Sequence, residues 1–184
     1  TLSLLCTCAR VMFVNLDACH ASGVEEAFYT TDRVLCLSLH RLGDGFFPGS
    51  GGAADAGEGA GRNHNVNLPV REGLTDERLA ELFVPVLAAA AERFQPFAVV
   101  FVAGPDVLAG DRVGGLNVSV AAYVECVHAV LSLGRPTVVL GGMGHSGPNA
   151  ARAWCAATAA VCGVELADQV PEHDYYEYYA PSYR

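Results

Sequence analysis

The chain has 184 residues, a formal net charge of −9 and a composition that is 52% hydrophobic. This length fits one domain with a sizeable core, and no apolar run approaches the roughly 20 residues of a membrane span. The acidic charge argues against direct binding to nucleic-acid backbones. It is compatible with basic partners such as histone tails or other lysine-rich peptides.

The seven cysteines are scattered through apolar stretches and include no CxxC pair. This pattern is typical of reduced thiols in an intracellular compartment rather than of a disulfide framework. Cys8 has no assignable role. Core positions are expected for Cys6, Cys36, Cys126, Cys155 and Cys162.

Hydrophobic patterning predicts strands and helices that alternate along the chain. Short apolar, β-branched runs indicate buried strands over residues 9–17, 33–39, 64–70, 97–103 and 137–140. Helical spacing of apolar residues indicates helices over residues 23–29, 118–133 and 148–161. Another helix is expected to be capped by Thr75, kinked at Pro85 and ended by Pro96. The alternation predicts a single α/β domain over residues 1–184, with a largely parallel sheet flanked by helices.

A glycine-rich loop over residues 40–62 interrupts this alternation and carries Phe46, Phe47 and Pro48. Loops of this length in compact domains are usually functional or disordered. The two aromatic residues favour an ordered loop, because in a disordered one they would lie in water. The acidic, aromatic tail that starts at Asp174 is expected to pack on the surface.

Polar residues follow three of the expected strands. Asp17 and Cys19 follow the first strand, Asp106 follows the fourth, and a turn ending in His145 follows the fifth. Ligands of parallel sheets bind outside the carboxyl ends of the strands. In extended backbone, Asp17 and Cys19 project to the same side, and a carboxylate and a thiolate at this spacing can hold zinc.

Each of these residues also has an ordinary structural interpretation. Strands often end in Asp because it favours turns, and Asp106 follows a proline. Free cysteines such as Cys19 are among the most buried residues. A histidine such as His145 is more often a surface or capping residue.

The turn after the fifth strand also fits the dinucleotide fingerprint GxGxxG, through Gly142, Gly144 and Gly147. Glu165 stands at about the right distance beyond it. Glycine-rich turns between a strand and a helix are common, however. The fingerprint also requires a further strand, for which the tail offers no candidate.

Several longer motifs carry a family resemblance. They are DACHASGVEEAFYTTDRV, SLHRLGDGFFPGSG, AGPDVLAGDRVGGLN, LGGMGHSGPNAARAW and PEHDYYEYYAPSYR. Together they resemble the zinc-dependent histone deacetylases of the class I type, from about residue 10 to the end of the chain. The resemblance implies an arginase/deacetylase-like fold, a catalytic zinc and hydrolysis of acetyl-lysine amides. The chain then corresponds to roughly the carboxyl half of the family domain.

The resemblance also implies roles for individual residues. Asp17, Cys19 and Asp106 match the zinc ligands, and His145 matches a tyrosine that stabilises the oxyanion. Phe47 matches an aromatic wall of the acyl-lysine channel. The rest of the channel is matched by Gly144 and Val113. A structural potassium site is matched by Ser38 together with the backbone carbonyls of Asp17, Cys19 and Leu39.

The sequence departs from the family pattern where the chemistry occurs. Cys19 replaces a histidine, His145 replaces the tyrosine, and Asn15 and Ser22 replace aspartates that orient two catalytic histidines. No His-His dipeptide occurs in the chain. Loss of an oxyanion donor reduces rates by about 10²–10³, and misplaced general bases reduce them by about 10²–10⁴.

Three functions remain open at this point. The favoured one is a catalytically impaired histone deacetylase-like module, retained for binding a protein partner or for self-association. The second is an active zinc-dependent deacylase that acts on acetyl-lysine peptides or histone tails. The third is a dinucleotide-binding domain. Residence in the nucleus follows from the resemblance alone, and no binding to nucleic acid or membrane is expected.

Overall fold

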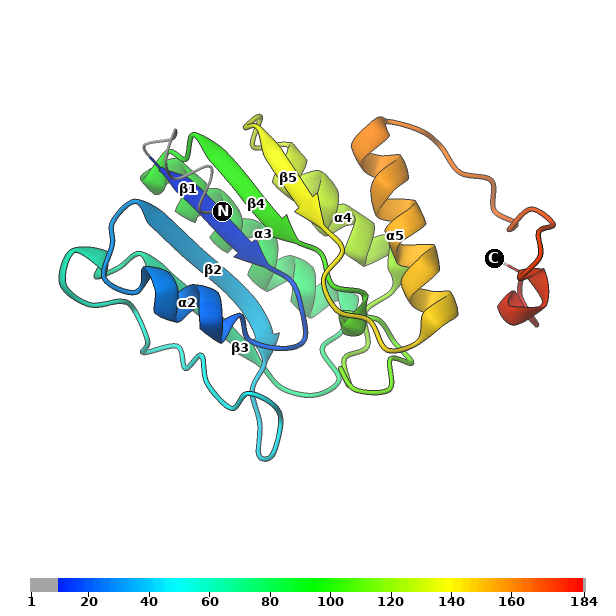
Figure 1. Ribbon diagram of the computed structural model, residues 1–184, viewed down its shortest axis with the longest axis horizontal. Helices are drawn as coiled ribbons and strands as arrows, with labels where there is room; N and C mark the ends of the chain where they lie inside the picture. The colour runs from blue at the N-terminus through cyan, green and yellow to red at the C-terminus, as the bar shows by residue number, and fades with distance from the viewer. Residues whose placement is uncertain (1–9, 184) are drawn as a thin grey trace.

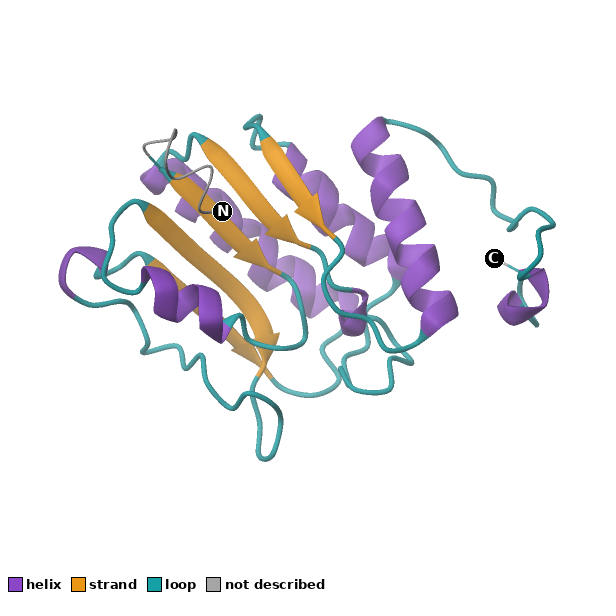
Figure 2. Ribbon diagram, viewed as in Figure 1, coloured by secondary structure: helices purple, strands orange, loops and turns teal. Residues whose placement is uncertain are grey.

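The computed structural model describes residues 10–183, which form an α/β domain around a five-stranded parallel sheet. The strand order is β3–β2–β1–β4–β5, and the arrowheads all point to the same edge (Figure 2). The predicted positions of Cys6, Cys8 and Ala9 lie outside the described residues. The strands are β1 (Val11–Asn15), β2 (Val34–Arg41), β3 (Asn65–Val70), β4 (Ala98–Val102) and β5 (Thr137–Leu140).

The helices cover the two faces of the sheet unequally (Figure 1). Three helices pack on one face and one short helix packs on the other. They are α2 (Ser22–Phe28) on the sparsely covered face, and α3 (Asp76–Phe94), α4 (Val120–Leu131) and α5 (Gly147–Cys162) on the other. This arrangement confirms the predicted parallel sheet flanked by helices.

Alternation along β1 explains the two cores. Met12 and Val14 point into the large core, where they meet side chains from α3 and α4. Val11 and Phe13 point the other way, into a small core beneath α2. All four side chains are buried, as expected of a central strand covered on both faces.

Several details differ from the sequence predictions. β1 ends at Asn15, so the strand alternation predicted to align Asp17 with Cys19 does not extend to them. Thr75 occupies the N-cap of α3 as predicted, but its side chain makes no cap hydrogen bond. Cysteine placement was also partly wrong: Cys36 and Cys126 are buried, but two others are exposed, namely Cys155 and Cys162.

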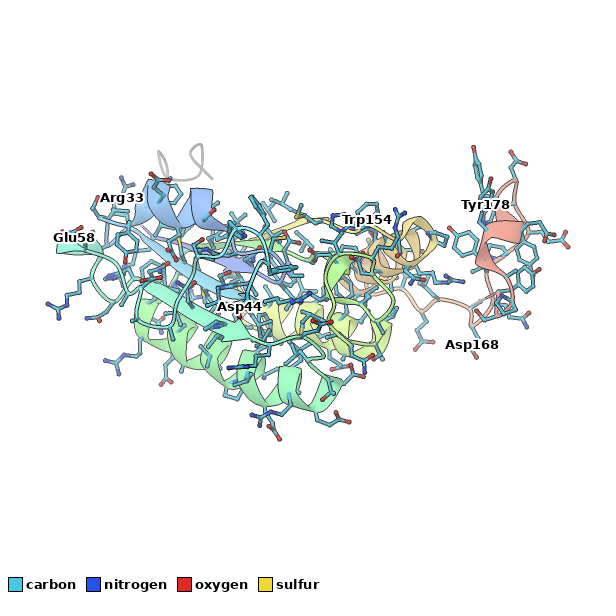
Figure 3. All side chains as sticks on the ribbon, turned by 90° about the horizontal axis from the view of Figure 1, so that it is seen from below. Arg33, Asp44, Glu58, Trp154, Asp168 and Tyr178 are labelled. Atoms are coloured by element: carbon cyan, nitrogen blue, oxygen red, sulfur yellow. The ribbon has the colours of Figure 1, made fainter. Side chains whose placement is uncertain are left out.

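An arginine on α5 contacts the tail. Arg152 lies 4.7 Å from the ring centroid of Tyr179 and donates to its carbonyl oxygen at 3.1 Å. Tyr178 remains 71% exposed, and Figure 3 shows it well beyond Trp154 of α5. Within residues 10–183, no helix is both long and apolar enough to cross a membrane.

Candidate functional site

The loops that follow β1, β4 and β5 meet at one edge of the sheet. The three strands are neighbours, and their last residues, Asn15, Val102 and Leu140, stand in register. The three loops therefore begin at the same level along the strand direction. This register brings together segments that are about 40 to 125 residues apart in the sequence.

Two hydrogen bonds connect these loops through the predicted metal ligands. The N–H of Ala18 donates to Asp106 Oδ1 at 2.9 Å, and the N–H of Met143 donates to Asp17 Oδ1 at 3.0 Å. Asp17 therefore touches the turn that carries His145, and Asp106 touches the loop that carries Asp17. All three polar strand ends contribute to one site.

Two glycines allow the backbone to close onto Asp17. A Cβ atom at Gly104 or at Gly142 would collide with Asp17 Oδ1. Gly142 also has a φ of +61°, a conformation that side-chain-bearing residues rarely adopt. The loops after β4 and β5 can approach the carboxylate only because these positions lack side chains.

Asp106, which is fully buried, and Asp17, which is half-buried, form an acidic pair. Burial, followed by the negative charge of Asp17, raises the pKa of Asp106 to about 7. Burial also raises the pKa of Asp17, against the opposing effects of the Met143 N–H and the charge of His145. Asp106 is 0% exposed, and its Oδ2 atom has no hydrogen-bond partner among residues 10–183. An unpaired buried carboxylate oxygen is unfavourable unless a cation or a proton compensates it.

Cys19 lies close enough to feel the same charges. Burial and the negative charges of Asp106, Asp17 and Asp111, in that order, raise the pKa of its thiol to about 11. The thiol is therefore protonated at neutral pH. A metal ion would have to displace this proton before the sulfur could bind it.

The donor set fits a zinc ion in part. The unpaired Oδ2 of Asp106 and the neighbouring carboxylate of Asp17 are suited to a divalent cation. However, no three His, Cys, Asp or Glu side chains within the described residues are grouped as metal ligands. The sulfur of Cys19 is therefore near the acidic pair without completing a ligand set.

His145 is held by the loop that follows Asp106. Its backbone N–H donates to Asp111 Oδ2 at 2.7 Å, and its Nδ1 lies 3.2 Å from Asp111 Oδ1. Arg112 Nε donates to the carbonyl oxygen of His145 at 2.9 Å. The backbone N–H groups of Val113 and Gly114 also donate to Asp111. These contacts fix both the backbone and the ring of His145.

The charge of Asp111 determines which ring nitrogen of His145 carries a proton. Burial raises the pKa of Asp111, but the N–H donors of Gly114, His145 and Val113 outweigh burial and hold that pKa below its usual value. An ionised carboxylate can only accept, so Nδ1 is the donor. In the neutral ring, Nε2 then carries a lone pair. It has no hydrogen-bond partner in the described part of the chain.

The residues predicted to line a substrate channel are distributed around this edge of the sheet. Phe47 is 75% exposed and Val113 is 45% exposed. Phe46, not Phe47, packs inward, because its ring lies 4.4 Å beneath the guanidinium of Arg41. Gly144 packs so closely that a Cβ atom would lie 3.0 Å from the side chain of Ala150.

A second polar group lies beside the site and was not predicted. We call it the Glu25 network. Glu25 Oε2 accepts hydrogen bonds from Asn65 at 2.6 Å and Asn67 at 2.8 Å and lies 3.1 Å from His20 Nε2. His20 Nδ1 lies 2.9 Å from Ser50 Oγ. The available signal was the pair of asparagines two residues apart on a strand, because both must point to the same face.

The turn that matches the dinucleotide fingerprint has another role. It does connect β5 to α5, but the N–H of Met143 within it donates to the Asp17 carboxylate. A phosphate at this N–H would meet a half-buried negative charge. β5 is also an edge strand, and no strand follows α5 in the described residues. The geometry does not favour a dinucleotide site.

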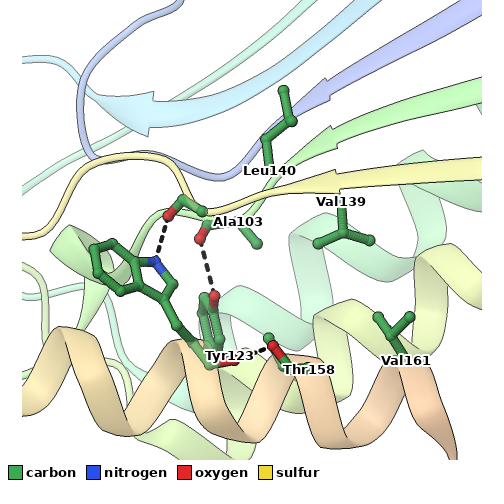
Figure 4. Close-up of a pocket in the computed structure, with 9 residues that line it drawn as sticks. Ala103, Tyr123, Val139, Leu140, Thr158 and Val161 are labelled. Atoms are coloured by element: carbon green, nitrogen blue, oxygen red, sulfur yellow. Dashed lines mark hydrogen bonds between the residues drawn. The ribbon is translucent and has the colours of Figure 1, made fainter.

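An apolar cavity of about 210 Å³ lies next to the site, between β5, α4 and α5 (Figure 4). Tyr123 O–H donates to the carbonyl oxygen of Ala103 at 2.9 Å, and Trp154 Nε1 donates to that of Gly141 at 2.7 Å. Both acceptors belong to the loops that carry the site. The cavity walls are therefore anchored to the loops after β4 and β5.

A parallel α/β sheet with a buried and a half-buried carboxylate at adjacent strand ends defines a site suited to a cation. A family model described as the histone deacetylase domain matches residues 2–161. The chain is 46% identical to "Histone deacetylase RPD3" of Saccharomyces cerevisiae, 45% to "Histone deacetylase 19" of Arabidopsis thaliana and 42% to "Histone deacetylase 1" of Homo sapiens. The chain belongs to the histone deacetylase family.

The alignments cover nearly all of this chain but a smaller part of each relative. They include 95%, 99% and 95% of the chain and 40%, 36% and 36% of the yeast, plant and human proteins. The chain thus spans less than half the length of the relatives it matches. The resemblance and the sheet together support the arginase/deacetylase-like fold.

Proposed function

We propose that this chain is a histone deacetylase-like module that binds zinc through Asp17 and Asp106 and hydrolyses acetyl-lysine amides weakly or not at all. The observation that carries the proposal is the acidic pair with its buried, unpaired Asp106 Oδ2. Such a pair is stabilised by a divalent cation. A bound zinc ion would supply polarisation of the acyl carbonyl and activation of a water molecule.

The chain's own residues would then hold the metal and the substrate. Asp17 and Asp106 provide oxygen ligands, and Cys19 becomes a third ligand once its thiol loses a proton. Phe47 and Val113 stand on the loops that would contact an acetyl-lysine side chain. The acidic net charge of −9 would favour approach of a basic peptide such as a histone tail.

The expected loss of catalysis follows from what Asn15 and Ser22 can do. Asn15 is neutral and directs its amide toward Cys19 and Ser38. Ser22 opens helix α2 and carries no carboxylate. Neither side chain can orient an imidazole and raise its basicity as an aspartate does. Binding of a protein partner, or of a second copy, is then the retained role.

One observation favours the alternative of an active deacylase. Asp111 and His145 form a carboxylate–imidazole pair, the arrangement by which enzymes orient a general base. With its Nδ1 proton directed at Asp111, a neutral His145 can accept a proton at Nε2. It cannot donate to an oxyanion until it is protonated. His145 would therefore replace a base better than it replaces the tyrosine of the family.

Metal analysis and an acetyl-lysine peptide assay on the same purified protein separate these functions. We expect close to one zinc per chain in the wild type, retained by Asp44→Asn on an exposed loop and lost in Asp106→Asn. Turnover should stay near background in all three proteins.

Chelator-sensitive turnover in the wild type would establish the active alternative. A wild type that takes up no zinc would refute the proposed metal site. The proposed zinc binding and the proposed lack of catalysis are therefore tested independently.

A further inference from the structure

The side-chain amide of Asn15 bridges two segments beneath the predicted metal site. Asn15 is the last residue of β1, is 1% exposed and pairs with Ser38 of β2. Its Nδ2 atom donates to the carbonyl oxygen of Cys19 at 3.1 Å and to Ser38 Oγ at 3.1 Å. One amide group thus ties the loop after β1 to the neighbouring strand.

The neighbouring hydrogen bonds fix the direction of these contacts. His40 Nε2 lies 2.9 Å from the carbonyl oxygen of Gly51, which can only accept. Burial, reinforced by the charge of His20, lowers the pKa of His40 to about 4, so the ring is neutral. Its Nδ1 atom is therefore an acceptor, and the hydroxyl of Ser38 donates to it at 2.9 Å. Ser38 Oγ is then left to accept from Asn15.

The opposite orientation of the Asn15 amide would be unfavourable. It would place Oδ1 against the carbonyl oxygen of Cys19, so that two acceptors would face each other. Asn15 donates to Ser38, Ser38 to His40 and His40 to the carbonyl oxygen of Gly51. This series of hydrogen bonds is complete only when Nδ2 of Asn15 faces Ser38.

The same two oxygens are those that the family resemblance assigns to potassium. A monovalent cation would need the carbonyl oxygen of Cys19 and the hydroxyl oxygen of Ser38, together with the carbonyl oxygens of Asp17 and Leu39. The amide hydrogens of Asn15 already occupy the first two. Asn15 also lacks the negative charge of the aspartate that stands at this position in the family. The residues present therefore do not fit the cation.

We propose that the Asn15 amide takes the place of the structural monovalent cation in this chain, so that the β1 loop is held without an ion. The polarised N–H groups supply the positive partner that the cation supplies elsewhere. Restoring the carboxylate should reverse the change: Asn15→Asp would leave two oxygens facing Cys19 and Ser38 without a donor. A cation would then be needed to hold these oxygens together.

Thermal unfolding in different chloride salts at constant ionic strength tests this proposal. For the wild type we expect the same Tm in potassium, sodium and tetramethylammonium chloride. For Asn15→Asp we expect a lowered Tm in tetramethylammonium, raised by roughly 5–10 °C when potassium exceeds its Kd about a hundredfold. Asn63→Asp, the same chemical change at an exposed position, should behave as the wild type.

A potassium-specific rise in the Tm of the wild type would overturn the proposal, as would an Asn15→Asp variant that folds without responding to potassium. A measurement on the wild type alone covers the case in which that variant does not fold. The two Nδ2 protons of Asn15 should exchange slowly with solvent, and their NMR signals should not move when potassium replaces tetramethylammonium. Rapid exchange or a potassium-dependent shift would refute the replacement.

Discussion

The Glu25 network lies between α2 and strand β3, whereas the acidic pair of Asp17 and Asp106 lies at the carboxyl edge of the same sheet, and the carboxylates of the two groups differ in how many partners they have. Glu25 Oε2 is contacted by three polar side chains, from His20, Asn65 and Asn67. Asp106 Oδ2 is more deeply buried and has no partner in the described residues.

This difference separates a structural polar group from a functional one. A carboxylate with three partners gains nothing further from a metal ion. A carboxylate with a free oxygen and an acidic neighbour is destabilised until a proton or a cation arrives. The comparison predicts that removing Glu25 weakens the fold, whereas removing the charge of Asp106 strengthens it.

The largest effect is expected for Glu25→Ala. The substitution leaves His20, Asn65 and Asn67 without their shared acceptor, and we expect a loss of about 3–5 kcal/mol in the free energy of unfolding. Urea unfolding measures it. Glu26→Ala, on the exposed side of the same helix, should change stability by less than about 0.5 kcal/mol. Equal effects of the two substitutions would show that the Glu25 network is not a stabilising unit.

Asp106→Asn should stabilise the metal-free protein at pH 8. The pKa of Asp106 is about 7 in the folded chain and 3.8 in the reference state. Between these values the folded state binds more protons, so wild-type stability falls as pH rises. The fall is at most roughly 4 kcal/mol, at about 1.4 kcal/mol per pKa unit.

Asparagine can accept from the Ala18 N–H without titrating, so its advantage over the wild type should be largest above pH 7 and should vanish near pH 4. Chelator-treated samples unfolded in urea across this range provide the measurement. A wild type whose stability is flat or increases over the same range would contradict the idea of an uncompensated acidic pair.

Zinc should make the wild type more stable than Asp106→Asn, the reverse of the order expected without metal. A zinc concentration about a hundredfold above the Kd would stabilise the wild type by about 2.7 kcal/mol and leave Asp106→Asn unchanged. If Cys19 is a ligand, each binding event releases the proton of a thiol whose pKa is about 11. Above about pH 8, where Asp106 is already ionised, the affinity should then rise about tenfold per pH unit, and Cys19→Ser should remove this dependence. Calorimetric titration at two pH values measures both.

The fold was largely predictable because its signals are local. Five apolar runs and their intervening periodic segments gave the strands and helices, and their alternation gave the parallel sheet. Cys155 and Cys162 were misplaced because α5 covers the edge of the sheet, where one helix face stays exposed. The sequence pattern of a helix does not indicate whether the helix packs at the edge of the sheet or over its centre.

The candidate site was predictable only in outline. The convergence of Asp17, Asp106 and the His145 turn follows from the rule for parallel sheets, whereas the partners of each side chain do not. Asp111 supports His145 from 34 positions away, and Asn15 points at Cys19 because β1 ends earlier than expected. Such contacts depend on loop conformations that residue types alone do not determine.

The smallest effect concerns His145, where the prediction is a tautomer rather than a change in stability. Since the Asp111 carboxylate can only accept, neutral His145 should carry its proton on Nδ1, which nitrogen-15 NMR resolves directly. His145→Gln should change the free energy of unfolding by only about 0.5–1.5 kcal/mol, because one partly exposed hydrogen bond is lost. Asp111→Asn should shift the tautomer ratio, whereas Asp44→Asn on the exposed loop should not. A wild-type proton on Nε2 would return His145 to the role of an oxyanion donor and separate it from Asp111, so that this edge of the sheet would hold an acidic pair without an adjacent base.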